Sequence, residues 1–180
     1  MCCRVTRPDS NNINPKGRCT LPLRKRNLIK DPTIFFLTTT TSNRRNFPHY
    51  PECLRIIERT LFDTVQDKSV SLFGYVIMPS HIHLLAGCKD GGPGMSRFIH
   101  SLKGRVRINL NHKGPLWEER FDDLVIKSEK QFRIKLDYIH YNPVKDNLVE
   151  NPDDWPYSSF LDWKNQDDTK GILFDFDKFY

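Results

Sequence analysis

The chain has 180 residues, of which 38% are hydrophobic, so it is long enough to bury one core of ordinary size. It carries 28 Lys and Arg against 22 Asp and Glu, and this formal charge of +6 favours a polyanionic partner such as nucleic acid. There is no apolar run of about 18 residues and no apolar signal segment at the N-terminus, which excludes a transmembrane helix and predicts a cytoplasmic protein.

The chain is expected to consist of one folded domain with an extension at each end. Residues 1–31 are polar and contain scattered Pro, Gly and Asn, which predicts a flexible N-terminal arm. Residues 32–163 are expected to form the domain, and the aromatic and acidic residues 164–180 a tail that packs on it. No CxxC pair occurs, so reduced thiols are predicted for all the cysteines: Cys2, Cys3, Cys19, Cys53 and Cys88.

The first half of the domain predicts a strand, a helix and a hairpin. Residues 34–40 are rich in aromatic and β-branched side chains, which indicates a strand. Residues 51–67 place apolar side chains three to four positions apart, which predicts an amphipathic helix. Residues 70–78 and 81–87 predict two further strands that are joined by a short turn.

The second half predicts a loop, a helix, a strand and a last helix. Residues 91–94 contain three glycines and a proline and predict the loop, and residues 95–110 predict a helix with basic exposed faces. Residues 121–127 predict a strand, and residues 129–141 a helix for which Ser128 is the candidate N-cap. The order β-α-β-β-α-β with a following helix predicts an α+β, ferredoxin-like fold, an antiparallel sheet with helices packed on one face.

Two histidines in the hairpin are the most informative residues of the chain. His81 and His83 flank Ile82, and side chains two positions apart on a strand point to the same face of a sheet. Both imidazoles should therefore leave the sheet on one side, while Ile82 enters the opposite layer. Two imidazoles side by side on a rigid strand are half of a divalent metal site.

Three familiar classes of histidine enzyme do not fit this pair. A histidine-triad hydrolase needs a third histidine two positions on, where this chain has Leu85. A zinc protease needs HExxH, and a two-histidine phosphoesterase needs a repeated His-x-Thr or His-x-Ser motif, and neither occurs. The remaining ligand of the site must therefore come from another segment.

The last predicted helix offers both a ligand and a nucleophile. Tyr138 and Asn142 are four positions apart, so they lie on one helical face, and Pro143 favours an end or a kink of the helix at Asn142. Asn142 offers an amide oxygen to a metal, and Tyr138 offers a phenol that could attack phosphorus. Tyr141 is the rival nucleophile, since it lies within about 60° of Tyr138 around the helix. His140 is expected on the helix surface rather than as a ligand.

Basic side chains off the buried stripe of the 95–110 helix, and one just beyond it, are candidates for phosphate contacts. A solvated basic face is the alternative reading of the same pattern. The candidates are Arg97, Lys103, Arg105, Arg107 and Lys113.

Four segments in order resemble the HUH single-tyrosine transposases, and above all their REP-associated tyrosine transposase branch. They are the metal strand at 78–85, the Trp-containing segment at 116–121, the tyrosine helix at 138–144 and the closing motif at 155–159. The match runs from about residue 33 to 163, and four motifs at these intervals are a far stronger signal than His-x-His alone. Ser80 stands where the family usually has Asn, which is expected to alter the turn and not the chemistry.

The resemblance implies a transposase that cleaves and rejoins single-stranded DNA at or near hairpins of palindromic repeats. Tyr138 would be the nucleophile and would form a 5′-phosphotyrosine intermediate. His81, His83 and Asn142 would hold a divalent metal, with Mg²⁺ or Mn²⁺ favoured and Zn²⁺ or Ni²⁺ left open. The family includes both monomers and homodimers, so the oligomeric state is left open.

Two other functions are compatible with parts of the pattern. A catalytically silent DNA-binding regulator derived from a transposase would bind DNA in a salt-sensitive way and cleave nothing. A replication initiator of the same HUH class is the weaker alternative, because such proteins often add a helicase domain for which this chain has no room.

Overall fold

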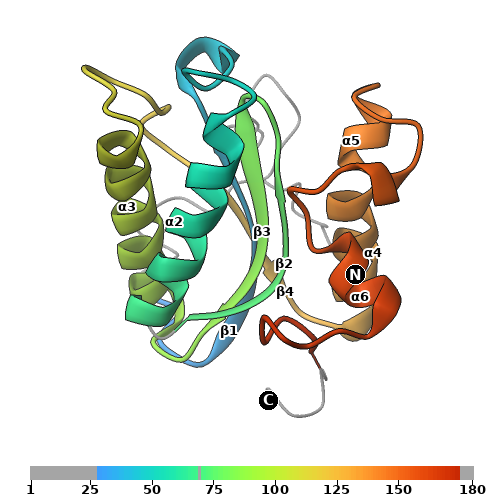
Figure 1. Cartoon of the computed structure of the whole chain (residues 1–180). Coiled ribbons are helices and arrows are strands. Elements are labelled where there is room, and N and C mark those ends of the chain that lie inside the picture. The colour runs from blue at the N-terminus through green and yellow to red at the C-terminus, as the bar shows by residue number, and fades with distance from the viewer. Residues whose placement is uncertain (1–27, 69, 175–180) are drawn as a thin grey trace, which may run out of the picture.

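An antiparallel sheet in the order β2-β3-β1-β4 forms the middle layer of the molecule (Figure 1). It is seen in a computed structural model that describes residues 28–68 and 70–174. Most of the predicted N-terminal arm, with Cys2, Cys3 and Cys19, lies outside these residues. The strands are β1 (Thr33–Thr40), β2 (Val70–Ile77), β3 (His81–Cys88) and β4 (Asp122–Ile126).

Helices cover both faces of this sheet. The crossover helices α2 (Cys53–Lys68) and α3 (Gly91–Asn109) pack on one face. The last long helix, α4 (Glu129–His140), lies across the other face and is followed by α5 (Asn142–Lys145) and α6 (Phe160–Asn165) (Figure 1). The predicted α+β, ferredoxin-like fold is confirmed. The prediction that the helices pack on one face of the sheet is correct for the two crossover helices, α2 and α3, but α4 packs on the other face. None of the described helices is both long and apolar enough to cross a membrane.

Alternation along β3 assigns its side chains to the two layers. Ile82 and Leu84 are fully buried and point toward the layer of α2 and α3. His81 and His83 point to the opposite face, beneath α4, as their spacing predicted. Burial of the apolar positions fixes the register, because a slip of one residue would exchange the two sets of side chains.

The segment 91–94 was predicted as a loop, and this prediction is wrong. α3 begins at Gly91, which has a φ of +59°, and the Gly92 N–H donates to the carbonyl of Ile29 over 2.8 Å. A Cβ at Gly91 would lie 2.2 Å from that same carbonyl oxygen. The glycines therefore let the segment before β1 approach the start of a helix closely, a tertiary contact that no local pattern reveals.

The closing motif, residues 155–159, covers the outer edge of β2. The Ile77 N–H donates to the Tyr157 carbonyl over 2.9 Å, and the Ser159 N–H donates to the Tyr75 carbonyl over 3.0 Å. The Trp155 indole N–H donates to the carbonyl of Ile77 over 3.1 Å. This pairing satisfies backbone groups that an edge strand would otherwise expose.

The described part of the C-terminal tail packs on the domain. Ile172 is fully buried, and the ring of Phe174 lies with its centroid 4.0 Å from that of Phe73 and 5.0 Å from that of Phe132. Lys170 donates to the carboxylate of Asp162 over 3.1 Å. Residues 175–180 lie outside the described part of the chain.

Candidate active site

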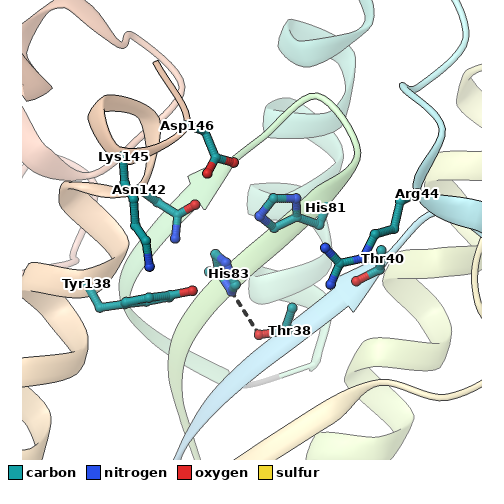
Figure 2. A pocket seen from close by; sticks show the side chains of 9 residues that line it. All are labelled: Thr38, Thr40, Arg44, His81, His83, Tyr138, Asn142, Lys145 and Asp146. Atoms are coloured by element: carbon teal, nitrogen blue, oxygen red, sulfur yellow. Dashed lines mark hydrogen bonds between the residues drawn. The ribbon is translucent and has the colours of Figure 1, made fainter. Parts of the chain in front are cut away.

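A polar cavity of about 200 Å³ lies where the ends of β1 and β3 meet α4 and α5 (Figure 2). Its walls combine residues from the sheet, from the turn after β1 and from the helices that follow β4. The residues that line it are Thr38, Thr40, Arg44, His81, His83, Tyr138, Asn142, Lys145 and Asp146. The four side chains predicted to carry the chemistry are all among them.

The two histidines are held by hydroxyl groups. Thr38 is the cross-strand partner of His83, and its Oγ1 lies 2.8 Å from Nδ1 of that histidine in a buried hydrogen bond. The Oγ of Ser80 lies 3.3 Å from Nδ1 of His81, and the two ring centroids are 4.7 Å apart. Because Nδ1 of each ring is engaged in this way, Nε2 is the nitrogen that each would offer to a metal.

The turn that carries His81 is fixed by the loop after β1. The carbonyl of Ser80 accepts hydrogen bonds from the N–H and the hydroxyl of Thr41, each over 2.9 Å. The carbonyl of Pro79 accepts one from the Phe47 N–H over 2.7 Å. These three bonds position the start of β3 and with it the first imidazole.

Tyr138 projects from α4 over the pair of histidines. Its ring centroid lies 5.3 Å from that of His83 and 5.8 Å from that of Phe36, both in edge-on geometry. Figure 2 shows the hydroxyl directed at His83. α4 can approach the sheet because β2 has Gly74 beneath it, where a Cβ would lie 2.8 Å from Leu136 Cδ1.

The end of α4 separates the two tyrosines. The helix stops at His140, and Asn142 opens the short α5, as Pro143 predicted. Asn142 is 4% exposed and lines the cavity. Tyr141 is 55% exposed, lies outside the cavity and contacts the ring of Phe160. The geometry therefore favours Tyr138 over its rival.

The expectation that His140 lies on the helix surface is wrong. The side chain is 5% exposed, and its Nε2 lies 2.9 Å from the hydroxyl of Ser159 in the closing motif. Burial lowers the pKa of His140 to about 4, so the ring is neutral at neutral pH. The position was readable from the sequence, because 140 follows the buried Leu136 by four residues on the same face.

The donor set suits a divalent metal only if an amide completes it. Within residues 28–68 and 70–174, no three His, Cys, Asp or Glu side chains are close enough to hold an ion. His81 and His83 supply two imidazoles, and Asn142 is the predicted third ligand beside them in the cavity. Two neutral nitrogens and one amide oxygen leave room for waters and for a phosphate oxygen in the coordination shell.

Three cations around Tyr138 were missed by the sequence reasoning. Arg44 and Lys145 line the cavity, and the Nζ of Lys145 lies 5.5 Å from the Tyr138 ring centroid. The Nζ of Lys135 lies 4.7 Å from the ring centroid of Phe36 and 5.5 Å from that of Tyr138. For Lys135 a signal existed, since it precedes Tyr138 by three residues on one face of the helix.

The five predicted phosphate contacts lie elsewhere. Arg97, Lys103, Arg105 and Arg107 belong to α3, on the face of the sheet opposite α4, and Lys113 follows that helix. None of the five lines the cavity. DNA that touched them would have to run beyond the candidate site, and their role stays a prediction.

Several of these cations already have partners. Arg97 donates to Asp90 over 2.6 Å, and Arg105 forms an ion pair with Asp67. Lys103 donates to the carbonyl of Glu118 over 2.8 Å, and burial lowers its pKa to about 8. Lys103 therefore holds the segment before β4 in place.

Comparison with known proteins gives a consistent group of relatives. No protein-family model matches the chain. A REP-associated tyrosine transposase of Escherichia coli K12 is 28% identical over 136 residues, which cover 76% of this chain and 81% of the relative. A relative from Haemophilus influenzae with the same family name is 36% identical over 151 residues, which cover 74% of this chain and 76% of the relative.

One solved structure extends this comparison to the fold. It is a REP-associated tyrosine transposase bound to a REP hairpin, and it is 25% identical to this chain with a TM-score of 0.66. The superposition covers 78% of this chain and 82% of the other.

Proposed function

Because the chain belongs to the REP-associated tyrosine transposase family, we propose that it cleaves and rejoins single-stranded DNA at or near hairpins of palindromic repeats. The solved relative bound to a REP hairpin supports hairpin DNA as the substrate class. The observation that carries the proposal is the meeting of Tyr138 with His81 and His83 at one cavity, although β3 and α4 are far apart in the sequence.

The chemistry is an exchange of one phosphate ester for another. The Tyr138 oxygen attacks the phosphorus, and its bond to phosphorus forms while the bond from phosphorus to the 3′ oxygen breaks. The phenol gives up its proton to solvent or a nearby base, and the departing 3′ oxygen takes one up. The products are a 5′-phosphotyrosine and a free 3′-hydroxyl. Since the ester bond is conserved, attack by another 3′-hydroxyl rejoins the DNA with no nucleotide cofactor.

His81, His83 and Asn142 are the residues that would hold a divalent metal, with Mg²⁺ or Mn²⁺ favoured. When bound, the metal supplies Lewis-acid polarisation of a non-bridging oxygen of the scissile phosphate. Thr38 and Ser80 orient the two imidazoles through their Nδ1 atoms, so the ligands are arranged before the DNA arrives.

Trapping of the covalent intermediate tests this function. The full chain is incubated with Mn²⁺ and a labelled single strand that carries a hairpin copied from palindromic DNA beside its gene. We expect an adduct that migrates with the protein on a denaturing gel. Tyr138→Phe should abolish the adduct, because it removes the attacking oxygen and leaves the ring in place.

Tyr141→Phe is the matched control, since it removes the rival hydroxyl from the same turn of the chain and should leave the adduct intact. An adduct that persists in Tyr138→Phe would overturn the assignment of the nucleophile. Salt-sensitive binding of the wild-type chain with no adduct in Mn²⁺, Mg²⁺, Zn²⁺ or Ni²⁺ would instead identify a catalytically silent regulator.

A further inference from the structure

We propose that Arg44, Lys135 and Lys145 form a phosphate-binding cradle around Tyr138, so that single-stranded DNA crosses the α4 face of the sheet and not the α3 face. The inference names the DNA path of the same site and rests on the proposed function. It assigns phosphate contacts to three residues outside the four segments on which the family resemblance rests.

Two of the cations face the reacting position. Lys145 comes from α5 and Arg44 from the short turn at Ser42–Arg44 after β1, and Figure 2 shows them on opposite sides of the cavity. A phosphorus atom in reach of the Tyr138 hydroxyl would have its non-bridging oxygens between these two side chains. An ammonium and a guanidinium that line the same cavity would stabilise the negative charge that grows on the phosphate during attack.

Lys135 extends the positive charge along the helix. It lies one turn before Tyr138, outside the cavity, and its ammonium is held over the faces of Phe36 and Tyr138. Cation–π contacts of this kind keep a charge in place without neutralising it. Lys135 can therefore meet the phosphate next to the scissile one as the strand leaves the cavity.

Within the described part of the chain, the charges of the cradle are not neutralised by ion pairs. Ion pairs engage Arg97 and Arg105 of α3, but none of those between described residues involves Arg44, Lys135 or Lys145. Asp146 is the single carboxylate among the described residues that line the cavity, so this lining and Lys135 together keep an excess of positive charge. A phosphodiester backbone is the polyanion that this arrangement fits.

The salt dependence of DNA binding measures the number of contacts between the cradle and the phosphates of the DNA. A fluorescently labelled short oligothymidylate is titrated with the full chain in EDTA, between about 50 and about 200 mM KCl. Each phosphate contact on a single strand contributes about 0.7 to the slope of log affinity against log salt. Arg44→Gln, Lys135→Gln and Lys145→Gln should each flatten the slope by about 0.7, and the triple variant by about 2.

Lys130→Gln is the matched control, because this lysine is exposed on the same helix but lies outside the cavity. We expect it to keep the wild-type slope. A triple variant with the wild-type slope, or a Lys130→Gln slope that falls as far as that of Lys135→Gln, would overturn the cradle. The slope is measured in EDTA and needs no cleavage, so a failure of the adduct experiment remains distinguishable from a failure of this one.

Discussion

The hydrogen bond between Thr38 and His83 decides which ring nitrogen faces the cavity. Thr38 Oγ1 lies 2.8 Å from Nδ1, and both side chains are buried, so no solvent competes for this contact. Nε2 is therefore the nitrogen that is left for a ligand. A ligand on Nε2 needs the lone pair of that nitrogen and hence the proton on Nδ1, and the hydroxyl oxygen of Thr38 can accept a hydrogen bond from this N–H. Thr38 is thus a positioning residue for His83.

Thr38→Val should weaken metal binding without unfolding the protein, because valine keeps the shape of threonine and loses the hydroxyl. We expect about a 10- to 100-fold loss of Mn²⁺ affinity by calorimetry, the range typical of lost outer-sphere partners of a ligand histidine. Nitrogen chemical shifts of His83 in the metal-free protein should also change, because Nδ1 loses its hydrogen-bond partner.

Thr38→Ser supplies the control, since it retains the hydroxyl and should keep both the Mn²⁺ affinity and the nitrogen shifts of the wild type. Equal Mn²⁺ affinity and an unchanged His83 spectrum in Thr38→Val would contradict the positioning role. A threonine with only a structural role would alter stability and leave the nitrogen shifts of His83 as they were.

At the level of elements, α4 is joined to the sheet edge through one serine. The hydroxyl of Ser159 accepts a hydrogen bond from the Tyr75 N–H over 3.0 Å and lies 2.9 Å from His140 Nε2. The same residue pairs with β2 through its backbone, so the closing motif connects the helix of the proposed nucleophile to the strand beside β3. His140 must be neutral for this packing, because burial disfavours its charged form.

This requirement predicts a loss of stability in mild acid. The unfolded chain takes up a proton near the ordinary histidine pKa of about 6.5, whereas the pKa of His140 in the folded protein is lowered to about 4. Its stabilising contribution is therefore complete above about pH 6.5 and falls as the pH drops toward about 4. Between about pH 7.5 and about pH 5 the loss should be about 2 kcal/mol.

Urea unfolding at these two pH values measures how much stability the protein loses through protonation of His140. His140→Gln keeps a side-chain nitrogen for Ser159 but does not titrate, so its stability should fall by about 2 kcal/mol less than that of the wild type. His100→Gln, at an exposed position of α3, should behave as the wild type does. A gap between His140→Gln and the wild type that stays constant with pH would refute this linkage.

The order and type of the elements could be predicted from the sequence, because each strand and long helix has its own periodicity. Local patterns failed where a distant contact sets the structure. The glycines at 91–94 begin a helix because the carbonyl of Ile29 approaches them closely, and Ile29 lies far from them in the sequence, so no local signal marks this contact. The burial of His140 could be read from its spacing to Leu136, but its hydrogen-bond partner Ser159 could not.

At the scale of the whole molecule, one chain brings every proposed site residue together. Tyr138 of α4 lies against His83 of β3 in the same chain, with ring centroids 5.3 Å apart. The sequence left open whether such a site is completed within one copy or between two copies. Because His81, His83, Tyr138 and Asn142 of one chain line the same cavity, the geometry supports a site that is complete within one copy of the chain, whatever the oligomeric state.

A mixing experiment tests this arrangement. Tyr138→Phe lacks the nucleophile, and His81→Ala lacks one imidazole, so neither should form the DNA adduct alone. If each site is built within one chain, the mixture should also form none, and the wild-type yield should rise linearly with protein concentration. Adduct formation in the mixture would show that α4 is exchanged between copies.

The candidate site could be predicted in part, and the missing part has a physical cause. Spacing brought His81, His83, Tyr138 and Asn142 to notice, because each pair shares a face of its own element. Of the cations around them, Lys135 could be predicted from its spacing to Tyr138, but Arg44 and Lys145 could not, because the sequence does not show which face of the sheet α4 covers. The basic residues predicted to contact phosphate belong to α3 or follow it, and α3 packs on the opposite face, the one toward which Ile82 points.

The outward turn of Tyr141 has a consequence for stoichiometry. Among the described tyrosines Tyr138 alone lines the cavity, so on the proposed mechanism a single chain holds one DNA end covalently at any moment. Removal of a DNA segment needs a cut on each side, and hence two covalent ends. On the proposed mechanism, the first end must be resealed or handed on before the same chain makes the second cut, or a second chain must make it. The number of inward-facing tyrosines thus sets how many protein molecules, or how many successive rounds, one excision requires.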